Sequence, residues 1–231
     1  MRFCAGSGKP AWCRARSTPM PIRAPKRRFK KNLPRVLARV QRTHPSRRVQ
    51  VWFQDEARSG QKGTISRVWA ARGSRPVRPR QTEYGFTYLF GAVCPATGHT
   101  NAWVMPTVGT APMQAHLNDL GRQVGRRRHA LCSYWIGPAG TPPRGSRYRP
   151  TSRCSRCRRA LAELNPAEML WRELRQRYLS NRVYRSTTAL ERAVSRAWCA
   201  LANQPERVRR LCNFGWLRSA CSSERRRPKT K

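Results

Sequence analysis

One short stretch of the chain decides the fold, and it reads Val49-Gln50-Val51-Trp52-Phe53-Gln54-Asp55-Glu56. Apolar and polar residues alternate in it and strand formers dominate, which predicts a β-strand that ends in the carboxylate of Asp55. For a carboxylate there, the alternatives are a functional site and an ordinary surface turn. Glu56 should point to the opposite face of the strand, because side chains alternate, and we expect it to support structure.

The residues that follow predict a hairpin and then a helix. Residues 86–93 form a second apolar run and residues 101–105 a third, joined by turn chemistry at residues 95–98. Pro112 is suited to the start of a helix. Apolar residues then recur at helical spacing, at Met113, Leu117, Leu120 and Val124.

The C-terminal part is predicted to be helical. Pro166 suits a first helical position, and Glu168 follows it in the first turn. That carboxylate either serves a site or complements the helix dipole. Further on, Thr188 to Glu191 fits a capping box, and the apolar stripe after it indicates core packing.

Charge is extreme and unevenly distributed. The net charge is +39, which predicts a polyanionic partner such as nucleic acid, or a chain partly unfolded by self-repulsion. Residues 1–54 hold 15 Lys and Arg, and residues 120–162 hold 11 Arg, with no acidic residue in either stretch. These stretches are either two DNA-binding regions or two segments that selection has not shaped as protein.

The cysteines do not predict a metal site or a disulfide framework. The close pair Cys154 and Cys157 has no second pair, and the four histidines are not at zinc-site spacing. No apolar run is long enough to span a membrane, and no hydrophobic stretch follows Met1 as a secretory signal would. We therefore expect reduced thiols and a cytoplasmic protein.

Several segments together resemble the mariner-type DDE transposases of bacterial insertion sequences. The resemblance runs from about Phe29 to Leu217, with one interruption, and is carried by residues 52–63, Trp69 with 72–76, 88–98, 163–171, 179–184 and 204–207. It implies an α/β, ribonuclease-H-like domain of the integrase and transposase type. The helix-turn-helix region that precedes the catalytic domain in this family is absent, so specific recognition of transposon ends should be absent too.

The resemblance also implies the roles of the site residues. Such enzymes cut and join DNA with two divalent metals, Mg²⁺ or Mn²⁺, held by three carboxylates. Asp55 would be the ligand that bridges both metals, and Glu168 the third ligand. DNA would be the partner, a homodimer the assembly, and the nucleoid the location. Asp119 is not expected to replace the second carboxylate, because it falls inside a predicted helix.

The second catalytic aspartate is missing between His129 and Glu163. Where the family has a short apolar strand followed by Leu-Asp, this chain has Tyr134-Trp135-Ile136. If each codon starts one base earlier, the codons for these three residues must encode Leu and then Asp. The next codons permit the family's following residues, and Cys157 to Arg159 permits its Leu-Pro-Pro. We infer that two compensating frameshifts bracket about residues 131–161.

The two inferred frameshifts should impair both folding and activity. The strand that carries the second Asp loses its apolar sequence, and six Gly and Pro residues between Gly137 and Gly145 should prevent a central strand. The predicted division is a basic segment, disordered or out of frame, over residues 1–31, an incomplete catalytic-like domain over 32–217, and a basic tail over 218–231. A basic DNA-binding arm is the rival explanation for the first segment.

The sequence thus predicts a transposase-like protein that is catalytically inactive, with impaired metal binding at Asp55 and Glu168. Two alternatives remain open. One is a non-catalytic basic DNA-binding protein, whose binding should weaken steeply with salt and ignore sequence. The other is an unstable pseudogene product with no cooperative fold.

Overall fold

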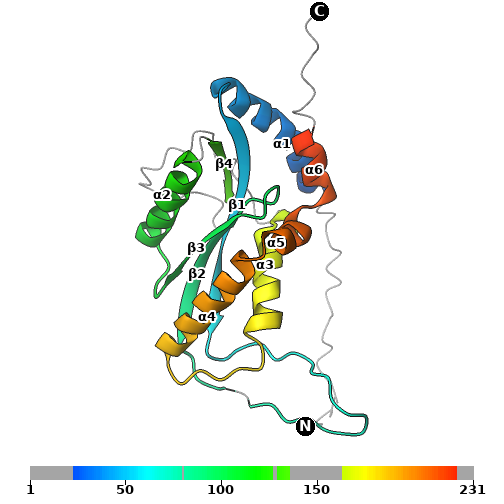
Figure 1. The fold of residues 1–231 in the computed structure, drawn as a ribbon, viewed down its shortest axis with the longest axis vertical. Coiled ribbons are helices and arrows are strands. Elements are labelled where there is room, and N and C mark those ends of the chain that lie inside the picture. Colours follow the sequence, from blue (N-terminus) through cyan, green and yellow to red (C-terminus); the bar gives the residue numbers. More distant parts are fainter. Residues whose placement is uncertain (1–22, 80, 127–128, 136–162, 223–231) are drawn as a thin grey trace, which may run out of the picture.

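A four-stranded sheet with helices on both faces forms the centre of the fold (Figure 1). The computed structural model describes residues 23–79, 81–126, 129–135 and 163–222. The strands lie in the order β3-β2-β1-β4. Antiparallel pairing joins β1 to β2 and β2 to β3, whereas β1 and β4 are parallel. The bounds are β1 (Arg48–Gly60), β2 (Phe86–Val93), β3 (Thr100–Met105) and β4 (His129–Trp135). This mixed α/β architecture confirms the predicted fold class and hairpin.

The strand β1 is longer than expected, so Asp55 lies within it and not at its end. Asp55 pairs with Gly91 of β2, and the pairing continues to Gly60 opposite Phe86. The expectation of a strand end at Asp55 was therefore wrong. Backbone hydrogen bonds to β2 extend β1 through polar residues, and the guanidinium of Arg58 covers the Phe86 ring at 4.5 Å.

The strand β4 corrects a second expectation. Residues 129–135 form a strand that pairs in parallel with β1, from Arg48 opposite His129 to Gln54 opposite Trp135. An edge strand is thus present up to Trp135, in the region where the sequence was expected to lose its apolar strand. Parallel pairing uses backbone groups, so apolar and β-favouring residues such as Leu131 and Tyr134 suffice at this edge position. The segment between Gly137 and Gly145 lies outside the described residues.

One face of the sheet is covered by α2 (Thr110–Arg126). Its apolar stripe packs on the side chains of β1 and β2 that point to this face. Leu120 and Val124 contact Trp52 and Ala92, and Met113 lies against Phe90. The helical spacing in the sequence therefore located this helix, since the same residues form its buried side.

The other face carries the main core, which the C-terminal helices complete. They are α3 (Ala167–Glu173), the π-helical segment η2 (Leu174–Tyr178), α4 (Thr187–Ala202), α5 (Pro205–Cys212) and α6 (Gly215–Ser222). Phe53 and Val93 of the sheet pack here against buried residues such as Leu170, Val194 and Leu201. The apolar stripe of α4 is core, as the sequence indicated.

The first helix, α1 (Arg23–Thr43), was not anticipated from the sequence. Leu33, Leu37 and Val40 form its buried side in the main core, and Phe29 meets Trp216 of α6 edge to face at 5.9 Å. The division proposed at residues 31 and 217 falls inside α1 and α6. Residues 1–22 and 223–231 lie outside the described part of the chain.

The start of α4 also differs from expectation. Ser186 is its N-cap, and the Ser186 hydroxyl accepts a hydrogen bond from the Ala189 backbone N–H at 3.1 Å. Thr188, which the capping-box pattern favoured, lies inside the first turn. Two adjacent hydroxyl residues, Ser186 and Thr187, precede Thr188, so three positions could fill the cap, and Ser186 fills it.

Just before α4, the chain anchors the long connection between β1 and β2. The Tyr184 carbonyl accepts hydrogen bonds from the side-chain amides of Gln61 and Gln81, at 2.9 and 2.6 Å, and the Tyr184 N–H donates to Gln81. Asn181, with φ of 55°, donates from its side-chain amide to the carbonyl of Ser66. These contacts hold both ends of the connection against the segment between η2 and α4.

Candidate active site

Asp55 is held on the sheet face that carries the C-terminal helices. Its side chain shares this face with Phe53, because strand residues two apart point the same way. It is buried, with 6% of its surface exposed. The indole N–H of Trp171, on α3, donates a hydrogen bond to Oδ2 of Asp55 at 3.0 Å. Asp55 is therefore a fixed carboxylate below α3 and not the exposed acid of a surface turn.

Glu168 reaches the same place from the first turn of α3. The Asn165 side-chain oxygen accepts from the Ala167 N–H at 3.1 Å, and the Asn165 carbonyl accepts from the Glu168 N–H at 3.2 Å. This turn sets the start of the helix above β1. Glu168 is half-buried and lies near enough to Asp55 to perturb its ionisation. The structure thus brings the two predicted site residues together.

The pair is electrostatically unfavourable as it stands. Burial raises the pKa of Asp55 to about 7; the Trp171 hydrogen bond opposes that rise, and the negative charge of Glu168 adds to it. Within the described residues, neither carboxylate forms an ion pair with Lys or Arg. Two adjacent carboxylates without a cationic side chain favour the binding of a metal cation.

The donor set fits one divalent cation better than two. Carboxylate oxygens are the ligands that Mg²⁺ prefers, and water usually completes its coordination. In the part of the chain that the structure describes, no group of three or more His, Cys, Asp or Glu residues could hold a metal. Asp55 and Glu168 are therefore two carboxylates where the resemblance implies three for a two-metal centre.

The end of β4 is where the third carboxylate was expected. Trp135, its last residue, pairs with Gln54, one position before Asp55. Residue 136, beside which the shifted reading frame places Asp, directly follows β4 and lies outside the described residues. The structure therefore does not test the proposed frameshifts.

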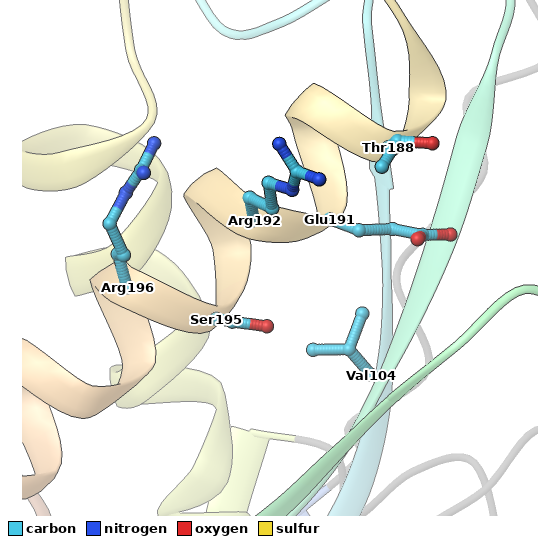
Figure 2. Close-up of a pocket in the computed structure, with 6 residues that line it drawn as sticks. All are labelled: Val104, Thr188, Glu191, Arg192, Ser195 and Arg196. Atoms are coloured by element: carbon cyan, nitrogen blue, oxygen red, sulfur yellow. The ribbon is translucent and has the colours of Figure 1, made fainter.

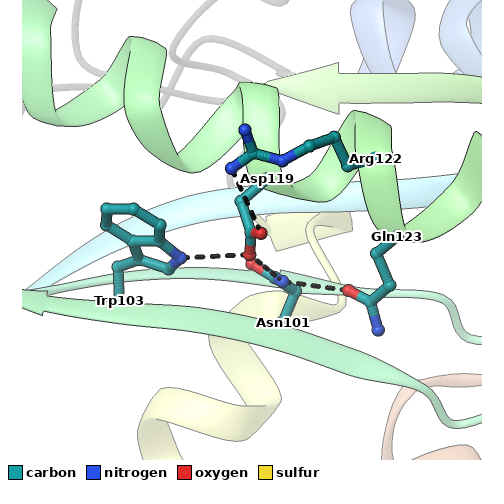
Figure 3. A network of polar contacts seen from close by, with 5 residues as sticks. All are labelled: Asn101, Trp103, Asp119, Arg122 and Gln123. Carbon is teal, nitrogen blue, oxygen red and sulfur yellow. Dashed lines mark hydrogen bonds and ion pairs between the residues drawn. The ribbon is translucent and has the colours of Figure 1, made fainter.

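Asp119 has a structural role, as the sequence predicted when it excluded this residue from the site. It lies on α2, on the opposite face of the sheet, and joins α2 to β3 (Figure 3). Its Oδ2 accepts from Asn101 Nδ2 at 2.9 Å and from Trp103 Nε1 at 3.1 Å, and Arg122 lies 3.6 Å away. The Asn101 hydrogen bond is the main cause of a lowered pKa at Asp119.

The polar groups directly behind the site were not found from the sequence. Gln54 is buried between Met113 and His116 of α2, with its Nε2 3.2 Å from the His116 ring nitrogen Nδ1. Burial lowers the pKa of His116 to about 4, so it is neutral at physiological pH. Glu56 is half-buried, and burial raises its pKa. These residues brace β1 from the face opposite Asp55.

A groove between β3 and α4 is a second concave region, with a volume of about 520 Å³. Figure 2 shows Ser195 and Val104 facing each other across it, while Arg192 and Arg196 extend away from Val104. None of the predicted site residues lines it. The full lining consists of Val104, Thr188, Glu191, Arg192, Ser195 and Arg196. We therefore place the candidate active site at Asp55 and Glu168.

Comparison with solved structures defines the class of fold. The chain superimposes on the Mos1 mariner paired end complex with Mn, with a TM-score of 0.51 and 13% identity over 86% of this chain and 62% of the Mos1 chain. The Mos1 paired end complex with Mg gives a TM-score of 0.49 and 15% identity over 96% of this chain and 67% of that chain. The fold is therefore similar to that of the Mos1 mariner chain with Mn. This chain spans about three fifths of the length of the Mos1 chain with Mn.

Sequence comparison then gives the family. The chain is 33% identical over 138 residues to the uncharacterized protein y4pE/y4sA of Sinorhizobium fredii (strain NBRC 101917 / NGR234), a match that covers 53% of this chain and 90% of that protein. The chain belongs to the family of that protein. No family model matches the sequence. Among the described residues, no helix has the length and apolar character needed to cross a membrane.

Proposed function

We propose that this chain is a DDE-transposase-like protein of a bacterial insertion sequence, built to bind DNA and a divalent cation but lacking a complete catalytic centre. The observation that carries the proposal is the pairing of Asp55 on β1 with Glu168 on α3, on one face of a ribonuclease-H-like sheet. The Mn in the Mos1 structure of similar fold supports the choice of cation. A DNA-bound homodimer in the nucleoid region of the cytoplasm completes the proposal.

The residues of the candidate site would have different roles. Asp55 and Glu168 would each supply carboxylate oxygens to Mg²⁺ or Mn²⁺. The cation would polarise a phosphodiester and increase the acidity of a bound water. Trp171 holds the Asp55 carboxylate, and the Asn165 turn holds Glu168 in place. Two carboxylates leave a second metal without sufficient ligands, so we propose that cleavage is slower by orders of magnitude than at a three-carboxylate site.

Nicking of supercoiled DNA in Mg²⁺ or Mn²⁺ tests this proposal. We expect binding of DNA by the purified chain, with nicking at or near background, and no further loss in Asp55→Asn or Glu168→Gln. Chelation should leave DNA binding intact. Efficient nicking that Asp55→Asn abolishes would show that the centre is complete and would overturn the proposed inactivity.

A non-catalytic DNA-binding role is the second candidate function. It is favoured by the net charge of +39 and by the exposed guanidinium groups of Arg192 and Arg196 on α4, which make no ion pair with the residues that the structure describes. It predicts sequence-independent binding with a steep dependence on salt. Metal binding separates the two candidates: a cation site that Asp55→Asn removes supports the transposase-like centre, and its absence supports the purely basic DNA-binding protein.

A further inference from the structure

Trp171 contacts the Asp55 carboxylate of the candidate site and lies on the same helix as Glu168. It lies three residues after Glu168, so both side chains leave the same side of α3. Its indole is buried, with 3% of its surface exposed, and its N–H donates to Oδ2 of Asp55 at 3.0 Å. One turn of α3 thus supplies both the Glu168 carboxylate and the indole N–H that holds the Asp55 carboxylate.

The sheet makes room for this indole at Gly91, which is the β2 partner of Asp55. A Cβ atom at this position would collide with Cη2 of Trp171 and would lie 3.1 Å from Cη2 of Trp198. The two indoles pack together with ring centroids 5.8 Å apart. A side chain at position 91 would therefore displace the indole that reaches Asp55.

The hydrogen bond does more than fill space. A phenylalanine would occupy most of the same volume, whereas only a group with a suitably placed N–H can hold Oδ2. A donor on Oδ2 fixes the rotation of the carboxylate and leaves Oδ1 as the oxygen with no hydrogen bond from Trp171. Partners that orient a metal ligand in this way commonly change metal affinity by about 10- to 100-fold.

We propose that Trp171 is a positioning residue: its N–H holds Oδ2 of Asp55, and Gly91 admits its indole, so that Asp55 presents Oδ1 to a divalent cation shared with Glu168. The inference rests on the proposed cation site and adds a residue to it. Trp171 does not itself bind the cation. Its effect acts through the orientation of Asp55.

The matched pair Trp171→Phe and Trp198→Phe tests the proposal. Both substitutions remove an indole N–H and part of one ring from the same aromatic pair over Gly91, but the Trp198 N–H makes no hydrogen bond to Asp55. Mn²⁺ affinity would be measured by calorimetry on the full chain at pH 8.5. We expect about a tenfold loss in Trp171→Phe and less than a twofold change in Trp198→Phe. Gly91→Ala should match Trp171→Phe, although it keeps the indole N–H.

A spectroscopic signal makes the test independent of activity. In a spectrum of ¹⁵N-labelled indole groups, the resonance missing from Trp171→Phe identifies the Trp171 N–H. That resonance should shift in Asp55→Asn without metal and again when Mg²⁺ is added to the wild type, while the Trp198 resonance should move less.

The possible outcomes distinguish a failure of the positioning role from a failure of the cation site. If Mn²⁺ binds, Asp55→Asn abolishes binding, and the two Phe variants have equal affinities, the positioning role is wrong while the cation site stands. If the wild type does not bind Mn²⁺, or Asp55→Asn binds it as well, both the cation site and the positioning role are wrong.

Discussion

At the scale of single residues, the candidate site holds a buried carboxylate in a position that is unfavourable for the stability of the fold. The Asp55 carboxylate is buried beside a second carboxylate, and it accepts a hydrogen bond from the indole N–H of Trp171. Burial of an unpaired charge is destabilising, and a group in this position resists ionisation. The arrangement is understandable if a cation completes it, because a divalent charge would remove the repulsion between Asp55 and Glu168.

A pH-dependent stability follows for Asp55→Asn. The pKa of Asp55 is raised from 3.8 to about 7 in the folded chain, so the penalty is absent below pH 3.8, grows between these values and is complete above pH 7. Without divalent cations, Asn should stabilise the chain at pH 8 by up to about 4 kcal/mol and have little effect near pH 4. Thermal or urea unfolding at both pH values measures this. Equal effects at both would contradict the raised pKa.

At the scale of elements, local patterns located most helices and strands but not all their limits. The apolar run at residues 86–93 matches β2 in full, and the stripe from Met113 to Val124 is the buried side of α2. The extension of β1 beyond Asp55 was not predictable, because pairing with β2 stabilises it and its own side chains there are polar. The helix α1 was missed because its basic residues obscured the buried spacing of Leu33, Leu37 and Val40.

The residues of the candidate site also divide into those that could be predicted from the sequence and those that could not. Asp55 and Glu168 could be named from the sequence because the segments around them resemble the catalytic blocks of DDE transposases. Their partners could not, because Trp171 and Gly91 read locally as an ordinary core residue and an ordinary strand glycine. Only the register of β1 on β2, together with the seating of α3, brings these two residues to Asp55.

The cap of α4 yields a prediction that separates the structure from the sequence pattern. Ser186→Ala removes the acceptor of the Ala189 N–H and should lower the free energy of unfolding by about 1 kcal/mol. Thr188→Ala, the control at the position that the pattern favoured, should change it by less than about 0.5 kcal/mol. Urea denaturation of both variants decides between the two caps. The reverse order would place the cap at Thr188.

At the scale of the whole molecule, the chain carries a large excess of positive charge, whereas Asp55 of β1 and Glu168 of α3 form a pair of carboxylates. Ten acidic residues stand against 49 basic ones, so most guanidinium and ammonium groups lack an acidic partner and can contact phosphates. The proposed DNA binding and the carboxylate site are thus separable properties. Damage to the carboxylate site can therefore leave the proposed DNA binding unaffected.

The exposed arginines of α4 allow the proposed DNA binding to be tested. The pair Arg192 and Arg196 lies one helical turn apart and makes no ion pair within the described residues. If both contact phosphates, Arg192→Gln with Arg196→Gln should reduce the slope of log K against log salt by about 2, equally for unrelated sequences. Thr188→Ala is a neutral control on the same face. An unchanged slope would exclude this surface from DNA binding.

We propose that a fold similar to that of the Mos1 chain is retained here while the second catalytic aspartate is missing from the reading frame. The most direct measurement compares Mg²⁺-dependent nicking by this chain with nicking by a chain in which residues 131–161 are translated in the shifted frame. We expect nicking to rise by orders of magnitude in the shifted-frame chain and to vanish again when Asp55→Asn is added. Equal nicking by the two chains would contradict the account.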